Sequence, residues 1–278
     1  MLDQEPEAAE ELARPAPSLS EKSVMRVLRR GELAVSGRLA DASNLSLVGT
    51  VTLDDVSMDC VYKPVRGERP LWDFPDGTLA QREVAAYRIS RMAGWTCVPP
   101  TVLRAGPFGD GMVQQWVDAQ EYDDLVDLLP MPALPDSWLP VLRARDEEGG
   151  HLVLAHADDP RLAVLAAFDV VVNNADRKAS HILPTADGRV YGVDHGLTLH
   201  ADDKLRTILW GFAGRPLPAE VLAGLERLQT ALADAPGLER MMTRREWAVL
   251  NRRLAHLIRA GRYPSPPDDR TPIPWPPL

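Results

Sequence analysis

Two aspartates eighteen residues apart, Asp176 and Asp194, have the surroundings in this chain that best suit chemistry. An apolar run that starts at Phe168 ends in Asn-Asn-Ala-Asp-Arg-Lys, and a second acidic element, Asp194-His195-Gly196, follows a turn and a short predicted strand. Transfer of the γ-phosphoryl group of ATP needs one carboxylate near an acceptor hydroxyl and a second carboxylate that holds a divalent metal. The pattern predicts that Asp176 is the catalytic base and that Asp194 is the main metal ligand.

Three neighbours of Asp176 fit the same chemistry. Lys178 is placed to touch the γ-phosphate, and Arg177 is expected to brace the loop. His181 follows Asp176 by five residues, where a second metal ligand is needed. Mg²⁺ prefers oxygen ligands, so an imidazole at this position favours Mn²⁺, or a site that holds metal only weakly.

Lys63 and Glu83 supply the other half of the predicted site. Lys63 ends a predicted strand in Val-Tyr-Lys-Pro, and Glu83 lies twenty residues later inside a predicted helix. A strand lysine tied to a helix glutamate places a cation over the α- and β-phosphates of ATP. The alternative is an outward-facing Lys63, with Glu83 pairing on the surface with neighbours such as Arg82.

The aspartates also have a plain structural interpretation. A helix, a turn and a hairpin can use Asp residues only to cap turns, as we expect of Asp187 before Gly188. The order Lys63, Glu83, Asp176, Asp194 along the chain favours the catalytic interpretation.

Two weaker signals concern nucleotide contacts. Ser43 and Asn44 end a loop of small and polar residues between the first two predicted strands, where backbone N–H groups could approach phosphate, although a plain hairpin loop would look similar. Gln115, Trp116 and Val117 form a connector that can offer main-chain groups and apolar surface to adenine. The alternative is an ordinary strand with Trp116 in the core.

The elements that position these residues predict an α+β fold with two lobes: a small antiparallel β lobe with one helix, and a larger, mainly helical lobe. Strands are expected within 32–65, 101–103 and 111–117, and helices over 78–92, 122–129, 160–172, 218–232 and 243–260. Thr78 with Gln81 predicts a capping box, and Asp159 before Pro160 predicts a helix start. The expected divisions are a disordered acidic tail (1–20), an ATP-binding lobe (21–118), a catalytic lobe (119–270) and a Pro-rich tail (271–278).

Composition excludes several classes of protein. The 278 residues are 45% apolar with a net charge of −9, and five of those negative charges lie in the first twelve residues. No basic patch is dense enough for duplex nucleic acid, and Arg26, Arg29 and Arg30 suit a solvated helix face. Cys60 and Cys97 have no metal-type spacing and indicate a reducing compartment. No secretory signal or membrane span is present, so we expect a cytoplasmic monomer.

The motifs carry a family resemblance over roughly residues 30–212. Val-Tyr-Lys-Pro, the Asn-x-Asp-Arg loop and Val-Asp-His-Gly-Leu are similar to patterns of type II phosphatidylinositol 4-kinases and HipA-like kinases. The chain thus resembles the phosphatidylinositol 3- and 4-kinase-like superfamily, and within it an actinobacterial family. The resemblance implies a bilobal protein-kinase-like fold, ATP, and Mg²⁺ or Mn²⁺. His181 departs from the family pattern, which has Asn there, and Lys178 is more similar to serine/threonine protein kinases.

Three functions are consistent with these residues. The first is a kinase that moves the γ-phosphoryl group of ATP to a hydroxyl of a protein or small molecule. A lipid acceptor is the least favoured, because the chain is acidic and has no polybasic segment. A variant of this function transfers AMP from reversed ATP. The second is a nucleotide-binding pseudokinase, favoured by His181. The third is a partner-binding protein that uses Trp72, Phe74 and the Pro-rich tail with Trp275.

Overall fold

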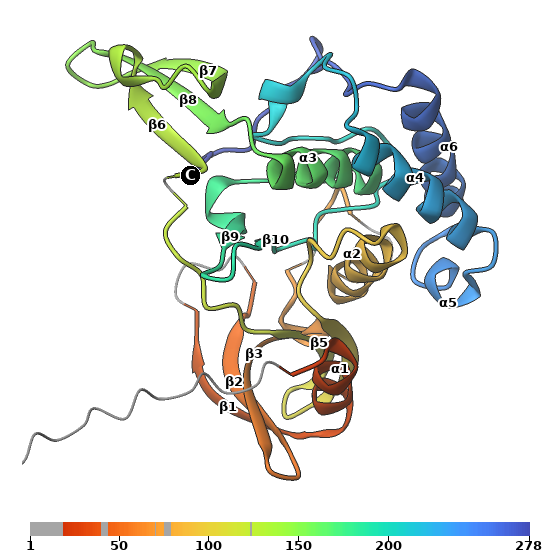
Figure 1. Ribbon diagram of the computed structural model, residues 1–278. Helices are drawn as coiled ribbons and strands as arrows, with labels where there is room; N and C mark the ends of the chain where they lie inside the picture. Colours follow the sequence, from red (N-terminus) through yellow and green to blue (C-terminus); the bar gives the residue numbers. More distant parts are fainter. Residues whose placement is uncertain (1–18, 40–43, 70, 75–78, 123) are drawn as a thin grey trace, which may run out of the picture.

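The computed structural model describes residues 19–39, 44–69, 71–74, 79–122 and 124–278, in two lobes (Figure 1). The first lobe contains α1 (Glu21–Arg30), β1 (Glu32–Arg38), β2 (Leu47–Leu53), β3 (Val56–Pro64), α2 (Leu79–Ala93), β4 (Thr101–Gly106) and β5 (Gly109–Gln115). The rest comprises β6 (Val126–Pro130), β7 (Trp138–Arg145), β8 (His151–Ala157), α3 (Pro160–Val172), β9 (Ile182–Pro184), β10 (Val190–Gly192), α4 (Ala219–Leu232), α5 (Pro236–Glu239) and α6 (Arg244–Ala260). The predicted α+β class with an antiparallel sheet is confirmed.

The first lobe is built on one antiparallel sheet with the strand order β1-β2-β3-β5-β4. Val27 and Leu28 of α1 pack with Cys60 and Tyr62 on one face of the sheet. Side chains alternate between the faces of a strand, so Lys63 projects from β3 to the side opposite Tyr62. The alternation of β3 therefore aims the lysine away from the α1 core and toward the second lobe.

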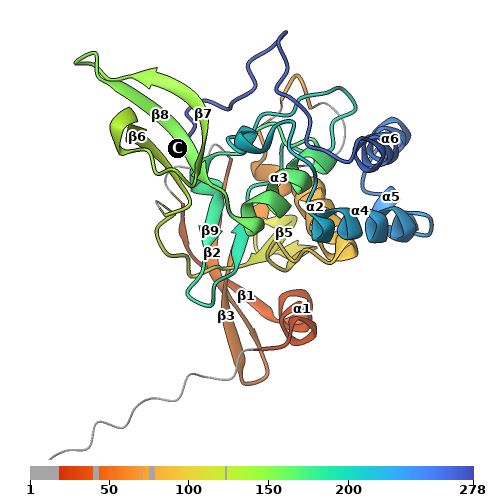
Figure 2. The ribbon, with the colours of Figure 1, turned by 45° about the horizontal axis from the view of Figure 1, so that its top comes forward.

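The second lobe surrounds α3, which is apolar on nearly all sides and therefore buried. Its start is the predicted one: Asp159 is the N-cap and accepts a hydrogen bond from the Arg161 N–H, and Pro160 is the first helical residue. The helices α4 and α6 pack beside it (Figure 2). Thr243 and Glu246 form a capping box at the start of α6, where the predicted helix over 243–260 begins.

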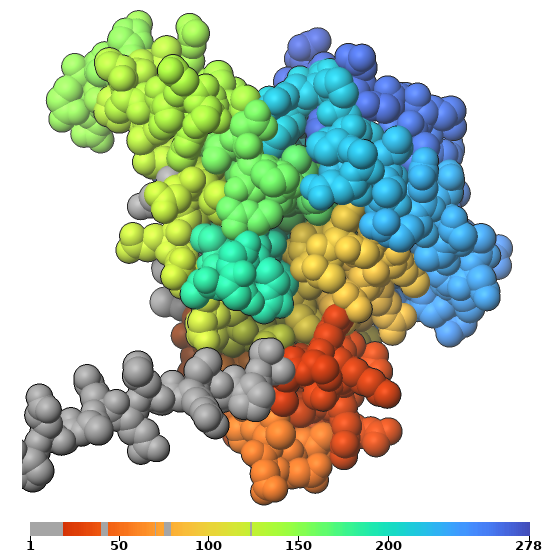
Figure 3. Space-filling view, in the orientation of Figure 1, coloured from red at the N-terminus to blue at the C-terminus, as the bar shows by residue number. Residues whose placement is uncertain are grey.

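The prediction of a helix over residues 122–129 is wrong. Residues 126–130 form β6, and β6, β8 and β7 make a three-stranded antiparallel sheet in place of the expected Pro-rich connection. A short apolar run suits either a helix or a buried strand, and here pairing with the distant β8 decides for the strand. Pro140 is accommodated because β7 is an edge strand with a bulge between Pro140 and Leu142. Figure 3 shows this sheet, in yellow-green, projecting from the helical body.

The Pro-rich tail is irregular, as expected, and lies on the second lobe. The Pro272 carbonyl accepts hydrogen bonds from the Thr207 N–H (3.1 Å) and the indole N–H of Trp210 (2.8 Å), and the Pro277 carbonyl accepts one from Ala179 (2.9 Å). Trp275 itself is exposed. None of the described helices combines the length and apolar character needed to cross a membrane.

The packing of α4 on Trp95, which follows α2 in the chain, yields a stability prediction. A Cβ added to Gly224, which is buried in α4, would overlap the indole ring of Trp95. Gly to Ala in a helix otherwise gains about 1 kcal/mol, but forced overpacking costs about 1–3 kcal/mol. We therefore expect Gly224→Ala to lower the free energy of unfolding, measured by urea denaturation.

Two variants control for this effect. The double variant Gly224→Ala/Trp95→Leu should lose less unfolding free energy than the sum of the losses in the two single variants, because the smaller side chain relieves the overlap. Gly37→Ala should be close to neutral, because nothing lies within 4 Å of a Cβ at that position. Unchanged stability of Gly224→Ala would contradict tight packing of α4 on Trp95.

Candidate active site

A cavity of about 320 Å³ between the two lobes collects most of the predicted catalytic residues. Lys63 and Glu83 line it from the first lobe, and Asp176 and Asp194 line it from the second. The remaining lining residues are Asn44, Leu45, Ser46, Pro64, Glu68, Arg69, Leu71, Leu79, Ala80, Gly196 and Leu197. Residues separated by up to about half the chain thus meet in one space.

Lys63 bonds to two carboxylates at once. Its Nζ lies 2.7 Å from Glu83 Oε1 and 2.9 Å from Asp194 Oδ1. Glu83 is buried, and its second oxygen accepts the His195 N–H at 2.9 Å. The surface alternatives for Lys63 and Glu83 therefore do not describe this structure.

The charges of this cluster depend on one another. Burial alone favours a neutral amine, but Asp194 and Glu83 outweigh it and raise the pKa of Lys63 above its ordinary value. Lys63 holds the pKa of Asp194 well below its usual range, so Asp194 is an anion at neutral pH. Burial raises the pKa of Glu83, against the attraction of Lys63. Two carboxylates sharing one ammonium leave this site rich in negative charge.

The loop that carries Asp176 begins with a left-handed turn. Asn173 ends α3 at φ 53°, and Asn174 Oδ1 accepts the Asp176 N–H at 3.0 Å. Asp194, the first residue of the second acidic element, and Leu199, which follows that element, also have positive φ (59° and 64°). Non-glycine residues rarely adopt this conformation, and it concentrates at functional sites.

Arg177 does not reach the cavity, because its side chain is completely buried. It bonds to Asp169 of α3 at 2.9 Å, to the carbonyls of His181 and Val193, and to His195 Nε2 at 2.7 Å. These partners lie on α3, the Asp176 loop and the Asp194 segment. Arg177 therefore braces the loop, as expected, and contacts no cavity group.

Asp176 has the electrostatics of a base. Burial raises the pKa of its carboxyl to about 6, against the nearby Lys178, whose Nζ lies 3.5 Å from Asp176 Oδ2. A carboxylate with a pKa near operating pH is both available and sufficiently basic to accept a proton. Lys178 lies beside Asp176 but is not among the residues that line the cavity, so its contact with the γ-phosphate stays a prediction.

His181 faces Asp194. Burial lowers the pKa of His181 to about 4, so the ring is neutral at pH 7. Its Nδ1 lies 2.9 Å from the Asp176 carbonyl and must donate there, which leaves the lone pair of Nε2 directed at Asp194 Oδ2, 3.6 Å away. Two acceptors with no proton between them suit a cation.

No cluster of three or more His, Cys, Asp or Glu side chains suited to a metal occurs among the described residues, so a metal ion here would take its other ligands from phosphate and water.

Glu68 is a cavity residue that the sequence analysis missed. Its carboxylate accepts the N–H groups of Leu79 (3.0 Å) and Ala80 (2.9 Å) at the start of α2. The expected capping residue, Thr78, lies outside the described residues. Glu68 is eleven residues from Leu79, and no local spacing reveals a cap supplied from such a distance.

The loop predicted to contact phosphate is described only in part. Ser43 lies outside the described residues. Asn44 lines the cavity, and its Oδ1 accepts the Arg69 N–H at 2.9 Å. Asn44 therefore borders the cavity with its side-chain oxygen bonded to the chain that follows β3, and its contact with phosphate stays a prediction.

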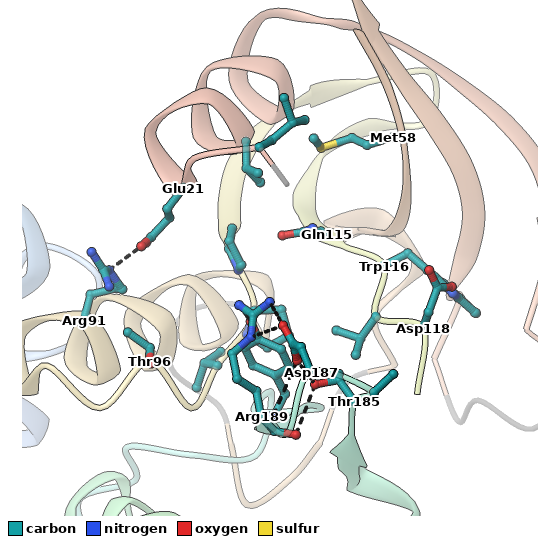
Figure 4. A pocket seen from close by; sticks show the side chains of 18 residues that line it. Glu21, Met58, Arg91, Thr96, Gln115, Trp116, Asp118, Thr185, Asp187 and Arg189 are labelled. Atoms are coloured by element: carbon teal, nitrogen blue, oxygen red, sulfur yellow. Dashed lines mark hydrogen bonds and ion pairs between the residues drawn. The ribbon is translucent and has the colours of Figure 1, made fainter. Parts of the chain in front are cut away.

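The connector residues line a different cavity. Gln115, Trp116 and Val117 border a space of about 550 Å³ that also contacts Glu21 of α1 and Arg189 (Figure 4). Trp116 is 37% exposed, so its alternative assignment to the core is wrong. The Gln115 and Trp116 N–H groups donate to the Pro100 and Asp59 carbonyls. Among the described residues, no loop or turn hydrogen bond uses the Val117 N–H.

Trp72 and Phe74, which precede α2, have opposite environments. Phe74 is buried and packs its edge on His200, whereas Trp72 is 91% exposed. Lys204 Nζ lies 5.8 Å from the centroid of the Trp72 ring. Phe74 is therefore part of the packed interior, and the use of Trp72 as a contact surface stays a prediction.

Comparison with known proteins places the chain in a family. No protein-family model matches it. It is 51% identical over 261 residues to the Mycobacterium tuberculosis protein Rv2133c, across 90% of this chain and 94% of that protein. The chain belongs to the family of Rv2133c. Such identity over nearly the full length of both proteins implies one fold for the family.

Solved structures identify the fold as protein-kinase-like. A crystal structure of the Golgi casein kinase with Mn/ADP bound matches with a TM-score of 0.53 and 13% identity, over 86% of this chain and 75% of that chain. A second Golgi casein kinase structure matches with a TM-score of 0.51 and 14% identity, over 89% and 79% of the two chains. The predicted protein-kinase-like fold of the Rv2133c family is confirmed. The finer resemblance to phosphatidylinositol kinases and HipA-like kinases stays a prediction.

The raised pKa of Asp176 predicts a cost to stability. A carboxyl whose pKa is higher in the folded protein than in the unfolded chain destabilises the fold progressively as pH rises from the unfolded value, 3.8, to the folded value, about 6, and the cost is constant above that. Asp176→Asn removes this cost and should raise the free energy of unfolding by about 1–2 kcal/mol at pH 8. The gain should shrink as the pH falls from 6 toward 4, measured by urea denaturation across that range.

Asp110→Asn, at an exposed position of β5, is the matched control and should show no such gain. If Asp176→Asn is no more stable than the parent protein at pH 8, the raised pKa is wrong.

Proposed function

We propose that this member of the Rv2133c family is an ATP- and divalent-metal-dependent phosphotransferase acting on a hydroxyl of a protein or small molecule. The observation that carries the proposal is the Lys63 ammonium bonded to both Glu83 and Asp194 in the cavity that Asp176 also lines. Phosphoryl transfer needs this combination: a fixed cation for the phosphates, a metal-holding carboxylate and a base beside the acceptor.

Lys63 and Glu83 act on the phosphates of ATP. Glu83 is buried and also bound to the His195 N–H, so it holds Lys63 at a defined position. Lys63 then contacts the α- and β-phosphates, and its bond to Asp194 gives way to phosphate oxygens. We place adenine at the connector, beyond the cavity of Lys63, because no loop or turn hydrogen bond of the described residues uses the Val117 N–H.

Asp176 orients the acceptor. Its carboxylate accepts the hydroxyl proton while the bond between the γ-phosphorus and the ADP oxygen breaks and a bond to the acceptor oxygen forms. Lys178, beside Asp176, neutralises charge on the transferring group. Arg177 contributes indirectly, by holding the loop.

Asp194 and His181 would hold the metal. A bound divalent cation supplies charge neutralisation at the β- and γ-phosphates. The nitrogen and oxygen ligands favour Mn²⁺ more than an all-oxygen set does. The Golgi casein kinase structure with Mn/ADP is consistent with this choice on a similar fold.

The direct test measures binding and transfer separately. The parent protein should gain thermal stability with ATP plus Mn²⁺ or Mg²⁺ and should transfer ³²P from γ-labelled ATP to itself or to lysate components. Asp176→Asn should keep nucleotide binding but lose transfer by at least about a hundredfold. Lys63→Met should weaken both.

Lys22→Met, at an exposed position of α1, is the control and should leave binding and transfer unchanged. No ATP binding by the parent protein, or Asp194→Ala equal to the parent protein in both assays, would contradict the proposal. Label transferred from α-labelled ATP would instead support AMP transfer.

His181 also favours the second candidate, a nucleotide-binding pseudokinase. His181→Asn replaces the imidazole with an amide oxygen that suits Mg²⁺. If the protein is an active kinase, this change should raise the ratio of Mg²⁺- to Mn²⁺-supported transfer by about tenfold. His151→Asn, at an exposed position of β8, should leave that ratio unchanged.

A pseudokinase would give a different result. It would bind ATP in the parent protein and in Asp176→Asn, and it would show no transfer with either metal.

A further inference from the structure

A further cavity, of about 650 Å³, lies in the second lobe and shares no lining residue with the candidate active site. It is bordered by α6, by the C-terminal end of α3 and by the chain that follows α6, which is drawn in dark blue in Figure 2. Small-molecule sites commonly have volumes of about 300–1,000 Å³. The cavity is therefore large enough for a ligand of its own.

Positive charge dominates its lining. Arg253, Arg262 and Arg270 border the cavity, and Asp203 is the only carboxylate among the described residues that line it. Such a concentration of cations is unusual in a chain with a net charge of −9. The lining therefore favours an anionic ligand.

Arg253 forms no salt bridge within the part of the chain that the structure describes. Its guanidinium donates to the carbonyls of Val171 (3.0 Å) and His200 (3.3 Å), and no carboxylate oxygen of the described residues lies within the 4.0 Å of a salt bridge. Burial lowers the pKa of Arg253 to about 10, against the attraction of Asp203, which forms no salt bridge with it. An anion in the cavity would supply the missing charge.

Arg270 carries an unused donor. Its Nε is buried and has no hydrogen-bond partner among the described residues. Its terminal nitrogens pair with Asp203 (2.8 Å) and Asp269 (3.2 Å), whose side chains are largely exposed to solvent. A buried N–H without an acceptor is costly, so a ligand oxygen that reoriented Arg270 and accepted from Nε would stabilise this side chain.

The other walls are apolar. Side chains of α3, α6 and the segments between and after them supply this surface: Val170, Leu205, Trp210, Leu257, Pro264 and Pro267. A small inorganic anion would leave these walls uncovered. The combination of guanidinium groups and apolar walls fits a ligand with both characters.

We propose that this cavity binds an organic phosphate whose apolar part lies against the apolar walls and whose phosphate oxygens accept from Arg253, Arg262 and Arg270. Several guanidinium groups around one anion match the oxygens of a phosphate better than the two of a carboxylate. The site does not depend on the proposed kinase activity, because none of its residues belongs to the candidate active site.

Octyl phosphate below its micellar concentration is the probe, measured by calorimetry and thermal shift on the full chain. It should bind and stabilise the parent protein, whereas octanol and inorganic phosphate should each bind at least about tenfold more weakly. Arg270→Gln and Arg262→Gln should each weaken octyl phosphate binding by about tenfold or more. Arg259→Gln, an exposed arginine of α6 that does not line the cavity, is the matched control and should bind within about twofold of the parent protein.

Three outcomes would overturn the proposal: no binding of octyl phosphate, octanol binding equal to it, or Arg270→Gln equal to Arg259→Gln. Inorganic phosphate binding as tightly as octyl phosphate would also overturn it, because the apolar walls would contribute nothing. Flotation with phosphatidylcholine vesicles containing phosphatidic acid separates the two sources of the ligand. Cofloating protein identifies a lipid headgroup, protein that binds octyl phosphate without cofloating identifies a free organic phosphate, and both support the proposal.

Discussion

The buried guanidinium of Arg177 is the interaction on which the candidate active site depends. Arg177 and Asp169 are both completely buried, and together they join α3 to the loop of Asp176. The same guanidinium bonds to the Val193 carbonyl and to His195, on either side of Asp194. A buried charge must be fully paired, so the positions of these segments cannot vary independently. One side chain thus sets the distance between the two aspartates.

A second constraint crosses from one lobe to the other. Lys63 and Glu83 belong to β3 and α2, and the His195 N–H connects Glu83 to the segment that Arg177 holds. The Lys63 ammonium is bonded to Asp194 of the second lobe. Electrostatic attraction and hydrogen bonds therefore join the two lobes at the cavity.

Several residues with unfavourable backbone conformations or shifted pKa values lie in the segments that carry Asp176 and Asp194. Asn173, Asp194 and Leu199 adopt left-handed backbone conformations, and Asp176 and His181 have pKa values shifted by burial. A protein selected only for stability would gain from relieving them. Their presence in the segments that carry Asp176 and Asp194 favours a site maintained for chemistry over turns capped by aspartate.

The sequence by itself determined the local structure and the chemical types. The start of α3 at Asp159-Pro160, the helices α2, α4 and α6 and the strands around Lys63 follow from capping and periodicity, which depend on neighbouring residues. The order of Lys63, Glu83, Asp176 and Asp194 indicated the chemistry. Their roles remain predictions, but the structure brings them into one cavity.

Only the tertiary structure decided the contacts between distant segments. β6 is a strand because β8 pairs with it, and Glu68 caps α2 from eleven residues away. The cavity bordered by Gln115, Trp116 and Val117 is not the one that Lys63 lines. The arginines of the 650 Å³ cavity line one space because the chain after α6 folds back. Pairing, burial and charge arise between residues far apart in sequence, so no local pattern encodes them.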